Sequence, residues 1–436
     1  MRNIFKLIII VVMIMYLSYS FILPEIAEVI KMNDYTNIYV VTDIHYMAEE
    51  IHDNSTLFES YVNNGDKLIQ YSEVFMDALH SDIVKNKPDA VVFAGDLTNS
   101  GAKVCHEDFA KRLSDIESTG TQVYVVPGNH DIGNEKAVYF SNNEIFWADY
   151  ISKDEFADIY NDYGYRDAIS KDNNSLSYLT KINDEIWALM IDTTIDFPNQ
   201  GGYINNDTLC WINECSSTAK SEGVQLVAVM HHSLIDHSKL INENYTIFNN
   251  TSVLDVFHNC NIEVVLSGHI HLQDIKSNYH SETNSILYDI ATSSLSVYPH
   301  QYGSLSYSPN EGYSYQTVKL DIEKYARDNK LEDTNLINFD DFADGFFVSG
   351  CCKFHRENVF YMQGLTDVDK GLIINTITEM NKMYFSGFRN ELLDQFRSTQ
   401  GFELLIKSNA GFVKSYFTHM LEDEFTDNNE LAIPYN

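Results

Sequence analysis

The sequence predicts an α/β protein followed by a smaller helical domain. Short apolar runs rich in Val, Ile and Tyr recur over residues 36–320, and stretches with helical spacing lie between them. From about residue 323, acidic and aromatic residues take up a helical pattern. A chain of 436 residues with 44% hydrophobic content has room for one large domain and a smaller one.

The predicted strands share one feature, because each ends on a polar residue of a kind that binds metal. Asn37–Thr42 precedes Asp43 and His45, Asp89–Ala94 precedes Gly95 and Asp96, Thr121–Val126 precedes Gly128, Asn129, His130 and Asp131, Glu185–Ile191 precedes Asp192, Gln225–Met230 precedes His231, and Ile262–Leu266 precedes Gly268, His269 and His271. In open α/β sheets, ligands bind outside the carboxyl ends of the strands. If the strands are neighbours, two Asp, one Asn and at least four His meet at one rim, as a two-metal hydrolytic site requires.

The residue types suit that chemistry. A carboxylate that ligates two cations holds them roughly 3.5–4 Å apart, while imidazole suits Zn, Mn, Fe or Ni and Asn offers an uncharged oxygen. Residues i and i+2 of an extended strand face the same way, so Asp43 with His45, and His269 with His271, can each serve one ion. We expect glycines to allow a sharp turn before the ligands. Turn residues and satisfied core histidines are the alternative explanation for each motif alone.

The segments between the motifs are predicted to form further helices and strands. Helical spacing predicts helices over residues 73–87, 107–118 and 251–259, and short strands are expected at 272–275, 285–290 and 313–322. Residues 136–184 form a polar, aromatic insertion, read either as a packed pair of peripheral helices or as a cap that stacks on a ring of the substrate. A small helical bundle is predicted from Phe339–Phe347, Asp367–Phe385 and Phe388–Leu421.

Five motifs stand in a fixed order along the chain: Asp43-Ile44-His45, Gly95-Asp96, Gly128-Asn129-His130-Asp131, His231-His232 and Gly268-His269-Ile270-His271. Together they resemble the calcineurin-like metallophosphoesterase superfamily over about residues 36–320. Within it, residues 95–101 and 297–303 resemble a bacterial group described as cyclic-nucleotide-phosphodiesterase-like, membrane-anchored and fitted with a helical C-terminal domain. The resemblance implies two mixed β-sheets packed face to face and flanked by helices.

The resemblance also implies a role for each motif residue. One metal takes Asp43, His45, Asp96 and His271, and the other takes Asp96, Asn129, His231 and His269, so that Asp96 bridges the two ions. His130 is not a ligand in this scheme but lies beside the phosphate, donating to an oxygen or protonating the leaving alkoxide. His232 is expected to touch a phosphate oxygen. Asp131 either orients His130 or serves a turn or helix start.

The implied activity is the two-metal hydrolysis of phosphate esters by a metal-bridging hydroxide. Phosphodiesters such as 3′,5′-cyclic nucleotides are the leading substrates. A phosphomonoesterase, a cell-envelope phosphodiesterase and a non-catalytic metal-binding protein are the alternatives. Two divalent or trivalent ions are the implied cofactors, and Mn, Fe and Zn all suit this mixture of ligands.

The charge balance restricts the partners. The chain has 63 acidic and 29 basic residues, a formal net charge of −34. Because such a surface repels polyanions, we expect no nucleic-acid polymer as a partner. Small phosphoesters remain compatible, since bound metal ions reverse the sign of the charge locally.

The first 32 residues are predicted to be a targeting segment. Arg2 and Lys6 precede an apolar stretch, Leu7 to Leu23, which Pro24 closes. Its length and the absence of a small-residue cleavage site directly after it favour an uncleaved signal anchor over a cleaved signal peptide. The positive flank places the rest of the chain outside the cytoplasm, either membrane-bound or secreted. We therefore expect an anchor at 1–32, a catalytic domain at 33–322 and a helical domain at 323–436.

The six cysteines are compatible with export but predict no zinc knuckle. Cys210 and Cys215 fall on a predicted helix, where residues i and i+5 point apart. Buried free thiols are therefore expected for most of them.

Overall fold

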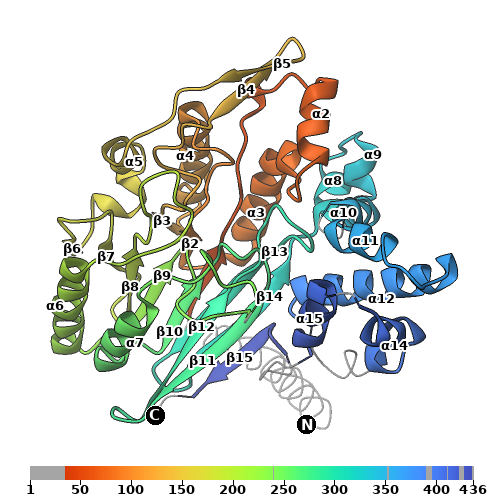
Figure 1. Cartoon of the computed structure of the whole chain (residues 1–436). Helices are drawn as coiled ribbons and strands as arrows, with labels where there is room; N and C mark the ends of the chain where they lie inside the picture. Colours follow the sequence, from red (N-terminus) through yellow and green to blue (C-terminus); the bar gives the residue numbers. More distant parts are fainter. Residues whose placement is uncertain are drawn as a thin grey trace, which may run out of the picture.

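The computed structural model describes residues 35–434, apart from residues 239, 351–352, 389–394, 410 and 422–426. Two β-sheets form its centre, and helices lie outside them (Figure 1). The predicted targeting segment, residues 1–32, lies outside the described residues. Within the described ranges, no helix combines the length and the apolar character that a membrane span requires.

The first sheet has six strands in the order β15-β14-β13-β1-β2-β3. A parallel half contains β1 (Thr36–Val41), β2 (Ala90–Ala94) and β3 (Gln122–Val126), and an antiparallel half contains β13 (Gln301–Ser308), β14 (Gly312–Lys319) and β15 (Glu430–Ile433). Every residue of β2 is buried, as expected for a parallel strand covered on both faces.

The second sheet has seven strands in the order β11-β12-β10-β9-β8-β7-β6. They are β6 (Ser170–Lys171), β7 (Tyr178–Lys181), β8 (Ile186–Ile191), β9 (Gln225–Met230), β10 (Val264–Ser267), β11 (Asp274–His280) and β12 (Ser285–Ala291). Strands β8, β9, β10 and β12 are parallel to one another, and the other three pair antiparallel. The predicted pair of mixed sheets is therefore confirmed, as are the six predicted strands that end on polar residues.

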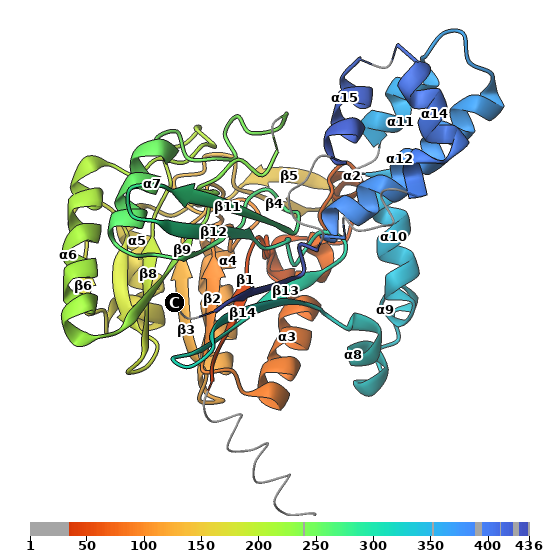
Figure 2. The ribbon, with the colours of Figure 1, turned by 90° about the horizontal axis from the view of Figure 1, so that it is seen from below.

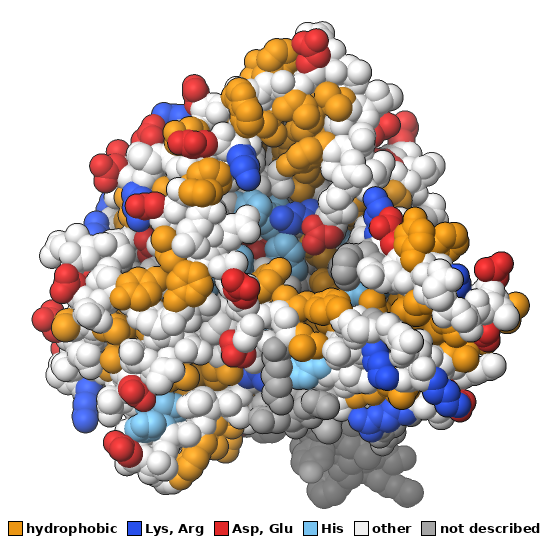
Figure 3. Space-filling model, viewed as in Figure 1, with side chains coloured by type: hydrophobic (Ala, Val, Ile, Leu, Met, Phe, Trp, Pro, Cys, Tyr) orange, Lys and Arg blue, Asp and Glu red, His pale blue; other side chains and the backbone are white. Residues whose placement is uncertain are grey.

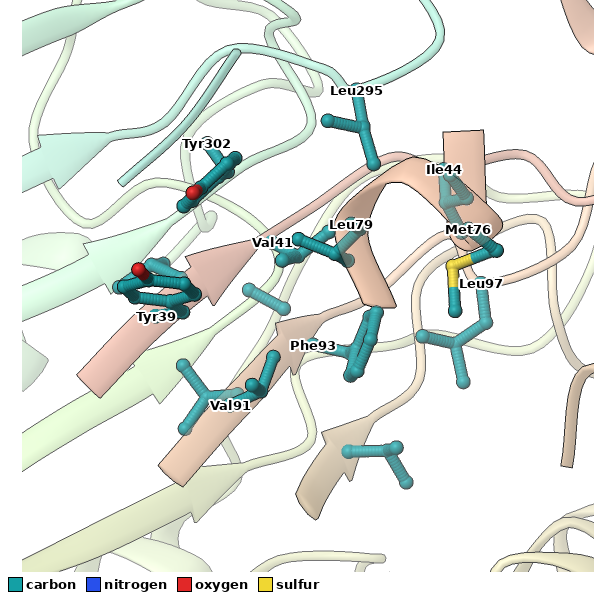
Figure 4. Packing of buried hydrophobic residues seen from close by; sticks show 14 of the residues in the cluster. Tyr39, Val41, Ile44, Met76, Leu79, Val91, Phe93, Leu97, Leu295 and Tyr302 are labelled. Atoms are coloured by element: carbon teal, nitrogen blue, oxygen red, sulfur yellow. The ribbon is translucent and has the colours of Figure 1, made fainter. Parts of the chain in front are cut away.

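A shared core joins the sheets, and helices cover their outer faces (Figure 2). Val125 of β3 and Val227 of β9 belong to one buried cluster. Helices α3 (Ser72–Asn86) and α4 (Lys103–Glu117) pack on the first sheet, and α6 (Asn206–Glu222) and α7 (Asn250–Asn259) on the second. In Figure 4, Leu79 of α3 lies over Phe93 of β2. The three helices predicted between the strands are thus confirmed as α3, α4 and α7.

The insertion differs from both alternatives considered for it. It contains the hairpin β4 (Val138–Ser141) and β5 (Glu144–Trp147), helix α5 (Lys153–Ile159), a π-helical turn at Asn161–Tyr165, and strands β6 and β7. Tyr160 and Tyr165 are buried in the core, so their rings are not available to stack on a substrate. Trp147, at 74% exposure, is an aromatic side chain that stays at the surface. Three shorter elements precede α3 and β2: the 3-10 turns Glu49–Ile51 and Ile69–Tyr71, and α2 (Thr56–Asn63).

The C-terminal part is helical, as predicted, with one exception. Its described helices are α8 (Ile322–Asp328), α9 (Thr334–Ile337), α10 (Phe339–Ser349), α11 (Lys353–Phe360), α12 (Asp367–Phe385), α14 (Gln400–Lys407) and α15 (Gly411–His419). A capping box formed by Thr366 and Asp369 begins α12. The exception is β15, which returns to the first sheet and pairs with β14.

The cysteines follow the expectation. Cys105, Cys215 and Cys260 are buried free thiols, and Cys210 is free and exposed. Cys351 and Cys352 lie outside the described residues.

Candidate metal centre

The predicted site residues meet at the carboxyl ends of strands from both sheets. Asp43 and His45 follow β1, Asp96 follows β2, Asn129 and His130 follow β3, His231 and His232 follow β9, and His269 and His271 follow β10. In Figure 3, histidines lie at the floor of a hollow bordered by hydrophobic side chains. Asp192, after β8, is not part of this group, because its carboxylate accepts hydrogen bonds from the backbone of Leu176 and Thr194.

The first group of potential ligands contains Asp43, His45, Asp96 and His271. Nε2 of His45 lies 3.2 Å from Nε2 of His271 and 3.7 Å from Oδ2 of Asp96. Nε2 of His271 lies 3.3 Å from Oδ1 of Asp43. Two carboxylates and two imidazoles thus converge on one point, with His45 and Asp43 fully buried. This donor set fits a divalent transition-metal ion.

The second group forms around His231. Its Nε2 lies 3.1 Å from Oδ1 of Asn129, 3.1 Å from Nδ1 of His269 and 3.4 Å from Oδ1 of Asp96. Asp96 therefore presents one carboxylate oxygen to each group, since its other oxygen faces His45. The predicted convergence of both sets on this one carboxylate is present in the structure.

The hydrogen bonds behind the histidines fix which ring nitrogens face inward. Nδ1 of His231 donates to the carbonyl of Ala94 at 2.9 Å, and Nε2 of His269 donates to the carbonyl of Asn244 at 3.1 Å. In the neutral form of both rings, the two nitrogens that face each other therefore carry lone pairs. Only a proton or a cation between them relieves their repulsion.

The electrostatics also call for positive charge at this point. Although burial opposes protonation, the charges of Asp96 and Asp43 raise the pKa of His231 to about 9. In the same way, Asp43 and Asp66 raise the pKa of His271 to about 9 against the effect of burial. Oδ1 of Asp43 and Nδ1 of His45 are buried and have no hydrogen-bond partner among the described residues. These unsatisfied atoms and the carboxylates of Asp43 and Asp96 fit a pair of bound cations.

The backbone at the ligands differs from the expected extended strand. Asp43, His45, Asp96, His269 and His271 all have φ between 46° and 68°. This is the left-handed region of backbone conformation. Residues other than Gly rarely adopt it, because it costs them free energy. Asp43 and His45 do reach the same group of ligands, but through strained turns and not through strand alternation. The expectation that His269 and His271 serve one ion is wrong, because His271 joins the first group and His269 joins the second.

Close packing, more than turning, explains two of the three glycines before the ligands. A Cβ atom on Gly128 would lie 2.2 Å from the backbone nitrogen of Asp96, and one on Gly268 would lie 1.9 Å from Oγ1 of Thr42. Gly95 does have a positive φ, of 84°. The expected role in turning therefore holds for Gly95, whereas Gly128 and Gly268 let neighbouring ligand loops touch.

His130 lies at the edge of both groups. Its Nδ1 donates to the carbonyl of Asn99 at 2.6 Å, and its Nε2 points inward, 3.8 Å from Oδ2 of Asp96. Burial lowers its pKa, which the charge of Asp96 partly offsets. Asp131 does not orient this ring, because its oxygens accept hydrogen bonds from the backbone nitrogens of Leu97, Thr98 and Gly128. The alternative of a turn role for Asp131 is the one the structure supports.

His232 requires a correction. Its ring is fully buried, with Nδ1 2.8 Å from Oγ1 of Thr193 and Nε2 2.9 Å from the carbonyl of Gln200. Because protein groups occupy both nitrogens, the imidazole is not placed to touch a phosphate oxygen. Burial lowers its pKa to about 3, so it stays neutral.

Three neighbours of the site, Asp66, Asn99 and Tyr61, were not predicted. Oδ2 of Asp66 lies 3.7 Å from Nδ1 of His271, on the side away from Asp43. Asn99 supplies the carbonyl for His130, and its amide nitrogen donates to the hydroxyl of Tyr61 at 3.2 Å. Asp66 and Tyr61 belong to α2 and the loop after it, which follow no predicted strand, so strand-end reasoning had no means of finding them.

The fold and this group of residues together define a metal-dependent phosphoesterase. Residues 36–273 match the family model described as calcineurin-like phosphoesterase, and the chain belongs to this family. Residues 321–427 match the model described as the C-terminal domain of cyclic nucleotide phosphodiesterase.

Several solved structures are similar to the chain. A dimetal phosphatase from Danio rerio aligns with a TM-score of 0.46 and 12% identity, over 64% of this chain and 94% of its own. PhoD aligns with a TM-score of 0.39 and 11% identity, over 65% of each chain. A putative 5′-nucleotidase from Staphylococcus aureus aligns with a TM-score of 0.37 and 12% identity, over 66% of this chain and 54% of its own. No curated protein matches the chain.

Proposed function

We propose that this protein hydrolyses phosphodiesters, with 3′,5′-cyclic nucleotides as the leading substrate class. The main support is the position of Asp96, which offers one oxygen to His45 and the other to His231. In this proposal Asp43, His45, Asp96 and His271 hold one ion, and Asp96, Asn129, His231 and His269 hold the other. When bound, such a pair of cations activates water and neutralises charge on the phosphoryl group.

The residues around the ions set the geometry of the reaction. The carbonyls of Ala94 and Asn244 hold the rings of His231 and His269 with one nitrogen facing inward. His130 acts as the general acid. In the doubly protonated ring, Nδ1–H is held by the carbonyl of Asn99, so the proton on Nε2 is the one that passes to the leaving alkoxide oxygen, and the ring is left neutral.

Two features favour a nucleotide-like diester over a simple phosphate. The match of residues 321–427 to a domain of cyclic nucleotide phosphodiesterase suggests this substrate class. Tyr61 also presents a ring with 38% exposure, packed 5.0 Å from Phe140 and hydrogen-bonded to Asn99, the residue that holds His130. Such a ring can stack on a base next to the general acid.

The test compares bis(p-nitrophenyl) phosphate with p-nitrophenyl phosphate, using the full chain loaded with Mn²⁺. Turnover of the diester that is lost in Asp96→Ala supports the proposal, and release of nucleoside monophosphate from cyclic AMP or cyclic GMP then tests the substrate class. Turnover that favours the monoester, or none on either substrate by a metal-loaded protein, contradicts it.

A cell-envelope phosphodiester is the second candidate substrate. The apolar stretch Leu7 to Leu23 favours it, because we propose that this stretch anchors the protein with its catalytic part outside the cytoplasm. Protease digestion of intact cells that express the chain tests the location. If residues 33–436 stay protected there and become sensitive only after lysis, the extracytoplasmic location is wrong.

A further inference from the structure

Ile270, the residue between His269 and His271, packs against the C-terminal helices. It is 8% exposed and belongs to a hydrophobic cluster, here called the C-terminal cluster. The buried members of this cluster from the α/β part are Ile270, Leu272 and Ala291, and those from the C-terminal part are Val359, Ile373, Ile377, Met380, Tyr384, Phe402, Leu405, Val413, Tyr416, Phe417 and Met420. The side chain between two predicted ligands thus shares one buried cluster with residues about 90 to 150 positions later in the chain.

The backbone just after the ligands is attached to the same region. The nitrogen of Gln273 donates to the carbonyl of Phe385, at the end of α12, at 3.1 Å. The side-chain amide of Gln273 donates to the carbonyl of Asn428 at 2.7 Å, and the nitrogen of Ile275 donates to Oδ1 of Asn428 at 2.8 Å. Gln273 is fully buried, so these bonds are shielded from water.

A second contact reaches His269 from the loop after β9. The ring of Tyr245 lies 5.1 Å from that of His269, and Asn244 accepts the hydrogen bond from Nε2 of His269. Tyr245 and Ile241 pack against the C-terminal cluster on their other side. The segment of His269 is therefore supported through two routes that both end on the C-terminal cluster.

The conformation of this segment explains why support is required. His269 and His271 have φ of 68° and 59°, a region that costs free energy for residues with a Cβ atom. Such a backbone persists only where the surrounding contacts offset its cost. Burial of Ile270 in the C-terminal cluster supplies a contact of that kind.

We propose that the C-terminal helical region is a structural part of the metal centre, and that Ile270 is the positioning residue through which it holds His269 and His271 in their ligating conformation. This inference rests on the proposed two-metal function. It predicts that substitutions in the C-terminal cluster weaken metal binding even though none of its side chains is a ligand.

The experiment uses three matched isoleucine-to-alanine variants of the full chain. Ile270→Ala removes the positioning side chain, Ile377→Ala removes a side chain of α12 from the same cluster, and Ile212→Ala removes a buried side chain of α6 that belongs to a different cluster. Mn²⁺ affinity is measured by titration calorimetry of metal-stripped protein, and Mn²⁺ per chain by elemental analysis, with circular dichroism as the check of folding. Ile270→Val serves as the conservative variant, and Ile377→Ala carries the test if Ile270→Ala does not fold.

We expect Ile270→Ala to weaken Mn²⁺ binding about 10- to 100-fold, in the range seen when groups behind metal ligands are removed. Ile377→Ala weakens it less, Ile270→Val largely restores it, and Ile212→Ala leaves it unchanged. Unchanged Mn²⁺ affinity in a folded Ile270→Ala protein overturns the inference, as does an effect of Ile270→Ala that Ile377→Ala does not share. If the unmodified chain binds no Mn²⁺, the proposed function itself fails, which is a different result.

Discussion

Two segments of the metal centre have the same arrangement of residues, but different parts of the chain pack against them. Ile44 lies between Asp43 and His45, as Ile270 lies between His269 and His271, and both segments contain ligands with left-handed φ. Ile44, at 1% exposure, packs into the main core with side chains such as Met76 and Leu97 (Figure 4). Ile270 packs against the C-terminal helices.

Hydrogen bonds show the same contrast. The nitrogens of Asp43 and His45 donate to the carbonyls of Gly95 and Asp96, in the loop after the neighbouring strand. The hydroxyl of Ser294 donates to the carbonyl of Asp43 at 2.7 Å. All these partners belong to the α/β part, whereas Gln273 is tied to the C-terminal region. Similar ligand motifs can therefore depend on different parts of one chain.

The largest effect is expected from Asp96→Ala, since Asp96 is the residue shared by the two halves of the centre. Loss of this carboxylate removes a donor from both groups, so bound Mn²⁺ is lost and kcat/KM falls by about 10³-fold or more. Elemental analysis and diester turnover measure the two effects. Asp192→Ala is the matched control, because Asp192 also follows a strand but lies outside the centre; retention of both ions by Asp96→Ala contradicts the shared role.

His130→Ala tests a residue that belongs to neither half. We expect metal content to stay at the level of the unmodified chain while kcat falls about 10²- to 10⁴-fold, because a general acid is lost and no ligand is removed. The loss is larger for a cyclic nucleotide than for bis(p-nitrophenyl) phosphate, whose leaving group needs little protonation. Full activity of the variant on the cyclic nucleotide rules out the acid role.

Ile44→Ala and Ile270→Ala compare the two supports directly. Truncation of Ile44 in the main core is expected to lower the free energy of unfolding by about 2–5 kcal/mol. Urea titration of metal-free protein measures the loss, and amide hydrogen exchange locates it. Faster exchange is expected at β1 and β2 for Ile44→Ala, but at residues 268–275 and α12 for Ile270→Ala. If amide exchange becomes faster in the same residues of both variants, the two segments do not depend on different parts of the chain.

A buried ion pair near His269 predicts a pH dependence of stability. Nδ1 of His237 lies 2.8 Å from Oδ2 of Asp274, and its Nε2 lies 3.4 Å from Oδ2 of Asp289. Asp289 also accepts hydrogen bonds from the hydroxyl of Ser267 and from the backbone of Leu234, which ties the loops after β9 and β10 together. Although burial opposes it, these two carboxylates raise the pKa of His237 from 6.5 to about 9.

Because the pKa is higher in the folded protein, the stabilisation is fully present below pH 6.5 and is lost as pH rises to about 9. Its size is on the order of 3 kcal/mol. Urea titrations at several pH values measure it in the unmodified chain and in His237→Gln. Equal pH dependence in the two proteins contradicts this role of His237.

Much of the centre could be predicted because its signals are local. A buried strand that ends on Asp96 or His231 is visible in a few consecutive residues, and the rule that ligands gather at the carboxyl ends of strands brings distant motifs together. The same reasoning correctly predicted α12, whose apolar positions and capping residues lie within a single stretch of sequence. It did not predict the hairpin β4–β5, which has four residues in each strand and whose second strand is exposed throughout.

The sequence by itself determined which residues follow the strands as potential metal ligands. Only the tertiary structure decided how those residues are held: the left-handed turns at Asp43 and His269, the protein partners of both ring nitrogens of His232, and the burial of Ile270 in a cluster with the C-terminal helices. The reason is physical. Strand ends follow from short-range periodicity, whereas a strained turn and a contact between distant segments depend on burial, which no local pattern encodes.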